Sequence, residues 1–139
     1  MLTRRQVTLT GLGLSLSAAL TPRSAAAEET TMFEITKTDA EWQKQLTKEQ
    51  YYVLRQHGTE RSGTSPLDKN YAEGTYDCAA CDLPLYSSDT KFNSGTGWPS
   101  FYDPLPNAVG TSTDYKLIYP RTEVHCRRCG GHLGHVFND

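Results

Sequence analysis

Hydrophobic positions between residues 38 and 58 recur at a helical spacing. Trp42 and Leu46 lie four residues apart, so they share one face of a helix and are expected to be core residues. Val53 and Leu54 form a second apolar group, which Gly58 ends. Two capping boxes, each a Thr followed three residues later by Glu or Gln, mark where these helices begin: Thr38 with Glu41, and Thr47 with Gln50. The pattern predicts two short, consecutive helices.

After Gly58 the pattern changes to short apolar runs separated by Gly, Pro, Asn, Asp and Ser. Aromatic and β-branched residues in runs of this length, bounded by turn residues, are typical of strands. We expect strands at residues 74–77, 85–86, 115–119, 123–125 and 132–137. The predicted fold is mainly β with two short N-terminal helices, in a small antiparallel β domain. A core this small calls for additional stabilisation.

The first 27 residues have the composition of a secretory signal. Arg4 and Arg5 precede an apolar stretch that is too short, and too rich in Gly, Ser and Thr, to span a bilayer, and a small-residue exit ends at Ala27. The paired arginines resemble a twin-arginine export signal, and Arg23 is compatible with that route. An ordinary signal peptide with two arginines is the alternative. We expect cleavage after Ala27, a tether at 28–37, one domain at 38–139 and a periplasmic location.

All four cysteines of the chain lie in two C-x-x-C pairs: Cys78 with Cys81, and Cys126 with Cys129. Each pair can supply two corners of a tetrahedron, and four thiolates form a shell that Zn²⁺ prefers in structural sites. Two local disulfides or a redox C-x-x-C remain the alternative in an exported protein. Because the twin-arginine route carries proteins that have already folded, zinc could be bound in the reducing cytoplasm. We therefore favour structural zinc, which would join distant parts of the fold.

The charge of the chain argues against one class of partner. The net charge is −2, and the leader removes three arginines (Arg4, Arg5 and Arg23) and no acid. The mature domain is therefore clearly acidic, which disfavours binding to the phosphate backbone of nucleic acids. We expect no nucleic-acid partner and a monomer.

Three further segments complete a specific pattern. They are residues 64–71, residues 92–101 with the sequence Gly97-Trp98-Pro99-Ser100-Phe101, and residues 130–137 with Gly130-Gly131-His132-Leu133-Gly134-His135. With the two cysteine pairs, and over roughly residues 40–139, they closely resemble the type B methionine sulfoxide reductases. The resemblance implies a zinc-stabilised, twisted β fold of the β-tent or Mss4-like type. It also implies reduction of the R epimer of methionine sulfoxide in oxidised proteins or peptides.

The residue types suit that substrate. A methyl sulfoxide needs an apolar wall beside its methyl group and proton donors near its oxygen. Trp98, between Gly97 and Pro99, can present a rigid indole face to the methyl group, and Phe101 can extend the wall. Considered without the resemblance, Trp98 would more often be a core residue, and Phe101 could equally be one. The resemblance places His132 and His135 around the sulfoxide oxygen, where they would assist its protonation. Zinc ligation or simple packing are the alternatives for these histidines.

The chain departs from the family pattern in two places. Family members continue beyond the Val-Phe-Asn-Asp run that ends here at Asp139, to an Arg-x-Cys-x-Asn strand whose cysteine is the nucleophile. We therefore expect the chain as given to be truncated after Asp139 and inactive, since zinc would occupy every cysteine. Thr96 stands where many relatives carry a recycling cysteine, so a thioredoxin-like external thiol reductant is expected. The alternative function is a non-catalytic zinc-binding module for peptide recognition, or an inactive remnant.

Overall fold

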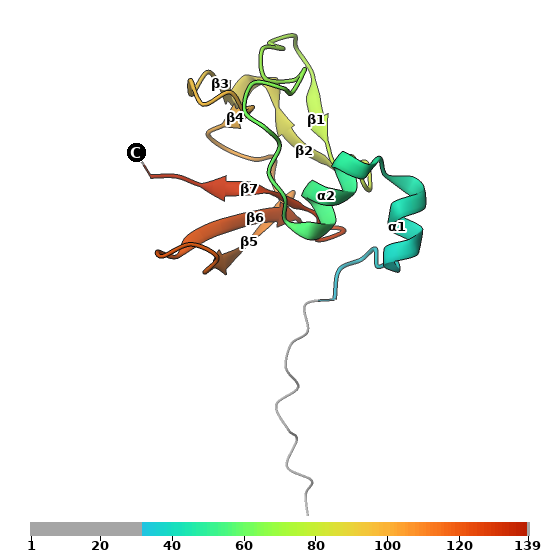
Figure 1. Cartoon of the computed structure of the whole chain (residues 1–139). Coiled ribbons are helices and arrows are strands. Elements are labelled where there is room, and N and C mark those ends of the chain that lie inside the picture. The colour runs from blue at the N-terminus through green and yellow to red at the C-terminus, as the bar shows by residue number, and fades with distance from the viewer. Residues whose placement is uncertain (1–31, 139) are drawn as a thin grey trace, which may run out of the picture. The chain divides into compact units, whose positions relative to one another are not determined.

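The computed structural model describes residues 32–138. Its helices are α1 (Asp39–Gln45), α2 (Lys48–Gln56) and the short 3-10 helix η2 (Ser88–Thr90), and its strands fall into three antiparallel sheets. β1 (Thr75–Asp77) pairs with β2 (Pro84–Ser87), and β3 (Lys91–Phe92) pairs with β4 (Ser100–Phe101). β5 (Val109–Asp114), β6 (Arg121–Cys126) and β7 (His132–Val136) form the third sheet, in that order. Figure 1 shows α2 beside β7, against which it packs.

Both predicted helices are confirmed. Each begins at a threonine that forms a reciprocal capping box with the residue three positions later, as predicted: Thr38 with Glu41, and Thr47 with Gln50. Trp42 is only 1 % exposed, and Leu46 and Leu54 are buried with it in the core. The guanidinium of Arg55 lies 4.6 Å from the centre of the Trp42 ring. The two helices therefore pack through the faces that the sequence pattern indicated.

The strand predicted at 115–119 is wrong. These residues form the exposed loop between β5 and β6, and Ile118 is fully exposed. The side chain of Asp114 turns the backbone there by accepting a hydrogen bond from the Lys116 N–H at 2.8 Å. The strand that pairs with β6 is instead β5, a run of mostly small and polar residues that the pattern did not indicate. The strands predicted at 74–77, 85–86, 123–125 and 132–137 are confirmed with shifts of one or a few residues.

The start of the described chain is attached to the domain. Within the segment expected to be a tether, the Ile35 N–H donates to the Arg128 carbonyl at 3.0 Å, and Glu34 forms an ion pair with Arg127 at 2.8 Å. The Phe33 ring lies edge-on to His125. Within residues 32–138, none of the helices combines the length and the apolar character that a membrane span requires.

Two predictions concern residues at the ends of the sequence. The export signal and its cleavage site fall outside the described residues, and so does Asp139. Asp139 matters only as a position in the sequence, because the family resemblance places the nucleophilic cysteine after it. That expectation stays a prediction.

Candidate metal centre and active site

The four cysteines lie on two turns of similar geometry. Cys78 and Cys81 follow β1, whereas Cys126 ends β6 and Cys129 precedes β7. In each turn, the residue four positions after the first cysteine donates its N–H to that cysteine's carbonyl at 2.8 Å and has a positive φ: Asp82 at 62° and Gly130 at 74°. The turns thus bring the edges of two different sheets together at the four sulfur atoms.

The sulfur atoms fit a tetrahedral metal ion. The Sγ atoms of Cys78 and Cys129 are 3.7 Å apart, those of Cys81 and Cys126 are 3.5 Å apart, and all four lie within 4.8 Å of one another. Tetrahedral zinc with Zn–S bonds of about 2.3 Å requires sulfur separations of about 3.8 Å. A disulfide would require about 2.05 Å, and all four cysteines are free thiols. The cluster therefore has the spacing of a metal site and not that of a pair of local disulfides.

Two thiols of this cluster, those of Cys78 and Cys81, are poorly suited to nucleophilic attack. The hydrogen bond with Cys129, together with burial, raises the pKa of Cys78 far above its ordinary value. Burial is the main cause that raises the pKa of Cys81 to about 11. Neutral, buried thiols are inert at neutral pH, whereas a metal ion would deprotonate them on binding.

All four histidines of the sequence gather in one place. His132 is buried, and its ring stacks on His57 with the ring centres 4.8 Å apart and the planes at 21°. His135 meets His132 edge-on at 5.3 Å. His125 joins them through the Glu123 carboxylate, which it contacts at 2.9 Å. The two histidines predicted to surround the sulfoxide are thus adjacent, and neither belongs to the cysteine cluster.

Glu123 organises this histidine cluster and was not singled out from the sequence. It is 3 % exposed, and its carboxylate accepts hydrogen bonds from Ser112 at 2.8 Å, from His125 and from His132 at 2.8 Å. Burial alone would raise the pKa of Glu123, but these three hydrogen bonds together lower it. The ionised carboxylate therefore accepts a hydrogen bond from the Nδ1–H group of His132. The Nε2 atom of His132 is left free to face a ligand.

Burial lowers the pKa of His132, and the neighbouring Glu123 only partly opposes this effect. His132 is therefore a neutral imidazole at neutral pH, with its proton on Nδ1 and a lone pair on Nε2. His135 has a different partner, since its Nε2 atom lies 2.7 Å from Asp114. The backbone N–H of Lys116, followed by His135, lowers the pKa of Asp114 to about 2. Each histidine is thus oriented by its own carboxylate.

Trp98 is held at the surface by a second segment. Its indole N–H donates to the Glu60 carbonyl at 2.7 Å, and its side chain is 38 % exposed. The Gly63 N–H donates to the Gly97 carbonyl at 2.9 Å, and the Ser62 hydroxyl to the Thr96 carbonyl at 2.6 Å. The segment 57–63 therefore fixes the Trp98 loop along its length. The role of Glu60 could not be predicted from the sequence, because Glu60 contributes its backbone carbonyl, which every residue type has.

The same segment connects Trp98 to the histidines. It begins with His57, which stacks on His132, and reaches Glu60, which holds the indole of Trp98. Three residues of extended chain span at most about 10 Å. A rigid aromatic face and the buried His132 are therefore attached to one short stretch of chain. This arrangement can hold a small group that has an apolar and a polar end.

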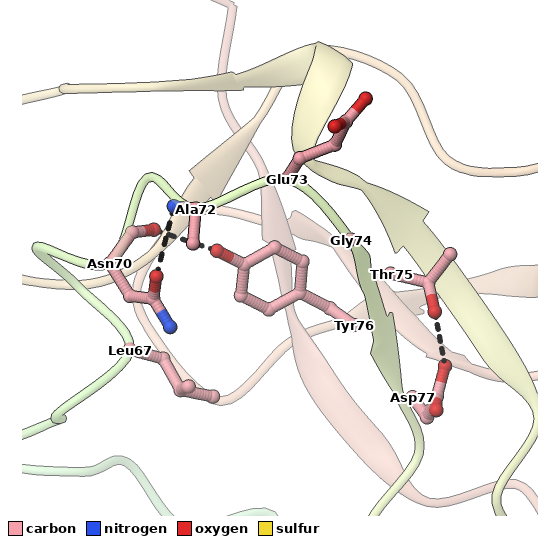
Figure 2. Close-up of a pocket in the computed structure, with 8 residues that line it drawn as sticks. All are labelled: Leu67, Asn70, Ala72, Glu73, Gly74, Thr75, Tyr76 and Asp77. Carbon is pink, nitrogen blue, oxygen red and sulfur yellow. Dashed lines mark hydrogen bonds between the residues drawn. The ribbon is translucent and has the colours of Figure 1, made fainter.

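Phe101 is placed elsewhere. Its ring stacks on Tyr86 at 4.4 Å and meets Tyr76 edge-on at 4.9 Å, between β1, β2 and β4. It is half-buried in this aromatic cluster, which agrees with the packing alternative weighed for it. Its partner Tyr76 also lines a cavity of about 280 Å³ (Figure 2). The residues that line that cavity all lie between Leu67 and Asp77, and none of them was predicted to bind substrate.

A second cavity borders the Trp98 loop. Its volume is about 490 Å³, and it is lined by Gly63 and Gly97 on either side of the hydrogen bond described above, together with Ser65, Pro66, Asp68, Lys69, Asn93 and Gly95. Most of the lining residues are glycines or carry polar side chains.

Comparison with known proteins agrees with these features. A family model described as the SelR domain matches residues 46–139. The peptide methionine sulfoxide reductase MsrB of Leptospira interrogans is 55 % identical over 108 residues, covering 77 % of this chain and 82 % of that protein. The protein of the same name from Agrobacterium fabrum is 53 % identical over 107 residues, covering 76 % and 79 %. That of Methanosarcina barkeri is 55 % identical over 106 residues, covering 76 % and 75 %.

The family match includes α2 and every sheet, so it covers the β domain together with its cysteine cluster. The chain belongs to the SelR-domain family of type B methionine sulfoxide reductases. The family resemblance seen in the sequence is confirmed.

Proposed function

We propose that the protein reduces the R epimer of methionine sulfoxide in peptides and proteins. The observation that carries this proposal is the joining of Trp98 and the His132–His135 pair by residues 57–63, in a chain that shares more than half of its aligned residues with methionine sulfoxide reductases. In the complete reaction the sulfoxide oxygen leaves as water, and two thiols lose their hydrogens and form one disulfide. A non-catalytic peptide-binding module is not favoured by these relatives.

The roles of the residues follow from their surroundings. The exposed indole of Trp98 would contact the methyl group of the substrate, held by the Glu60 carbonyl. His132 and His135 are each oriented by a carboxylate and would act on the sulfoxide oxygen. His132 would first take up a proton on Nε2, from water or from an attacking thiol, and then pass it to that oxygen. Phe101 would support this surface from the aromatic cluster and not as part of the wall itself.

The four cysteines would hold Zn²⁺ through Cys78, Cys81, Cys126 and Cys129, where the ion would supply folding energy. All four cysteines of the sequence would then be ligands. The nucleophile that the family resemblance implies is a cysteine that would follow Asp139. A thioredoxin-like external thiol would complete turnover. Export by the twin-arginine route, a periplasmic location and a monomeric state are part of the same proposal.

The test is an assay of the natural gene product, with the 139-residue chain as a parallel sample. Each is incubated with a peptide carrying either the R or the S epimer and with dithiothreitol, and methionine is measured by chromatography. We expect the natural product to reduce the R epimer only. In the natural product, Trp98→Ala should lower kcat/KM at least about tenfold, a loss of about 1.4 kcal/mol in transition-state stabilisation, with unchanged zinc content.

Other outcomes would contradict the proposal in defined ways. Reduction of the S epimer, or no reduction of either epimer by the natural product, would refute the activity. Unchanged kinetics in Trp98→Ala, with zinc retained, would show that Trp98 is only a structural residue.

A further inference from the structure

A second group of potential metal ligands lies outside the cysteine cluster. His57, Glu123 and His132 each present one ligand atom, and the three atoms lie within 4.8 Å of one another. Two imidazoles and one carboxylate are a common donor set for divalent transition metals. We propose that these three residues form a second, reversible binding site for a divalent transition metal such as Zn²⁺ or Cu²⁺. Occupation of this site blocks His132, so the regulatory part of this inference rests on the proposed function.

Two of the three ligands are already fixed. Glu123 and His132 are 3 % and 4 % exposed, and His132 Nδ1 lies 2.8 Å from the Glu123 carboxylate. A tetrahedral ion with bonds of about 2.1 Å needs its ligand atoms about 3.4 Å apart. The ion takes the place of the proton on His132 Nδ1, and the neutral ring then carries its proton on Nε2. Ser112 and His125 continue to orient the carboxylate through its other oxygen.

The third ligand is able to turn and close the site. His57 is exposed, and its ring lies over the ring of His132 through a stacking contact. A stacked ring can rotate to direct a nitrogen lone pair at the ion without breaking a hydrogen bond. His57 also ends α2 in the left-handed conformation, with φ at 56°. The histidine is thus placed by the helix end, and a water molecule can fill the fourth position of the ion.

The consequence for activity is competition. With a metal ion on Nδ1, the His132 ring can release its Nε2 proton only by becoming an imidazolate, so it no longer passes protons to a sulfoxide oxygen. Metal at this site therefore inhibits the reductase without disturbing the cysteine cluster, whose sulfur ligands come from other positions. Inhibition of this kind is reversed by a chelator that is too weak to remove a metal ion from four thiolates.

The experiment counts metal ions before any activity is measured. The protein carrying one equivalent of zinc is titrated with Zn²⁺ by isothermal calorimetry, without substrate, and the bound metal is verified by elemental analysis. We expect a second equivalent to bind. The variant His57→Asn should lose at least about tenfold in affinity for that equivalent, as expected for removal of a ligand, while keeping the first. Asn is chosen because it tolerates the left-handed conformation at this helix end.

A matched control separates the site from general histidine binding. His135→Gln removes a neighbouring imidazole that contacts Asp114 and not Glu123, and it should still bind the second equivalent. Only one zinc per chain in the unmodified protein, or a second equivalent retained in His57→Asn, would overturn the site. Binding without inhibition of methionine-R-sulfoxide reduction would overturn its regulatory role alone. Failure of the proposed function would leave the metal count unaffected.

Discussion

Replacing Cys129 with Ser tests whether the cysteine cluster determines the stability of the fold. The side chain is 1 % exposed, and its sulfur lies 3.7 Å from that of Cys78. The cluster links the β1–β2 sheet to the turn between β6 and β7. The remaining core is small and made mainly of Trp42, a few leucines and two alanines. Loss of the metal should therefore affect the whole domain.

The magnitude follows from the metal's contribution. Four-ligand zinc binding is coupled to about 10–16 kcal/mol of folding free energy, so loss of one ligand of four removes at least about 3 kcal/mol. A buried serine hydroxyl without a partner costs about 1–3 kcal/mol more. The total of about 4–6 kcal/mol is comparable to the whole stability of a domain of this size, about 5–15 kcal/mol. At about 4–8 °C per kcal/mol, Tm should fall by about 20 °C or more.

The assay combines thermal unfolding, followed by circular dichroism, with zinc content from elemental analysis. Two substitutions at Cys81 form a matched pair, and the site can accept a larger residue because Cys81 is only partly buried. Cys81→His keeps a zinc ligand and should retain the metal, whereas Cys81→Ser should behave as Cys129→Ser does. A Cys129→Ser protein that unfolds cooperatively at the temperature of the unmodified protein, with no metal bound, would refute the reasoning.

Two further predictions concern the Trp98 loop and pH. Gly97 has a φ of 87°, and a Cβ there would lie 2.8 Å from the Gly63 nitrogen. Gly97→Ala should therefore lower the free energy of unfolding, measured by chemical denaturation, by about 2–4 kcal/mol. Gly95 has a similar φ, but a Cβ there would meet open space, so Gly95→Ala should lower the free energy of unfolding by only about 1 kcal/mol. Equal losses in the two variants would show that the contact between a Cβ at position 97 and Gly63 does not matter. The pKa values of Glu123 and His132 are both lowered on folding, so the unfolded state binds more protons and stability falls as pH drops. The free energy of unfolding, with zinc content verified, should decline as pH falls below about 6.5 through His132 and again below about 4.5 through Glu123; a constant value from about pH 8 to 5 would contradict the His132 assignment.

The helices and the metal site were predictable because their signals are local. A capping box or a C-x-x-C pair is complete within four residues, and the structure reproduces both capping boxes and gathers both pairs. The two histidines of the Gly-Gly-His-Leu-Gly-His run lie together on β7, but their role was implied by the family resemblance and not by their spacing. Local spacing therefore identified the helices and the cysteine cluster, and the resemblance identified the candidate substrate site.

Strand pairing was less accessible because it is decided at long range. The run Tyr115–Tyr119 has the residue types of a strand but lies in an exposed loop, since residue type alone supplies no pairing partner. The polar run of β5 becomes a strand because all six of its residues pair with β6. The same limit applies to Glu123. The sequence does not show that this acidic residue is buried, because its partners Ser112, His125 and His132 come together only in the folded sheet.

Helix α2 joins the metal centre to the candidate active site. The Arg55 guanidinium donates to the Cys129 carbonyl at 2.9 Å, so the helix is bonded to the metal-binding turn. Its next residues reach His57, whose ring stacks on His132 only three positions after that cysteine. The backbone then continues to Glu60 and holds Trp98. A metal ion bound at the cysteine cluster would fix the turn at Cys129, and through α2 it would also fix the spacing between the histidines and the indole without contacting either.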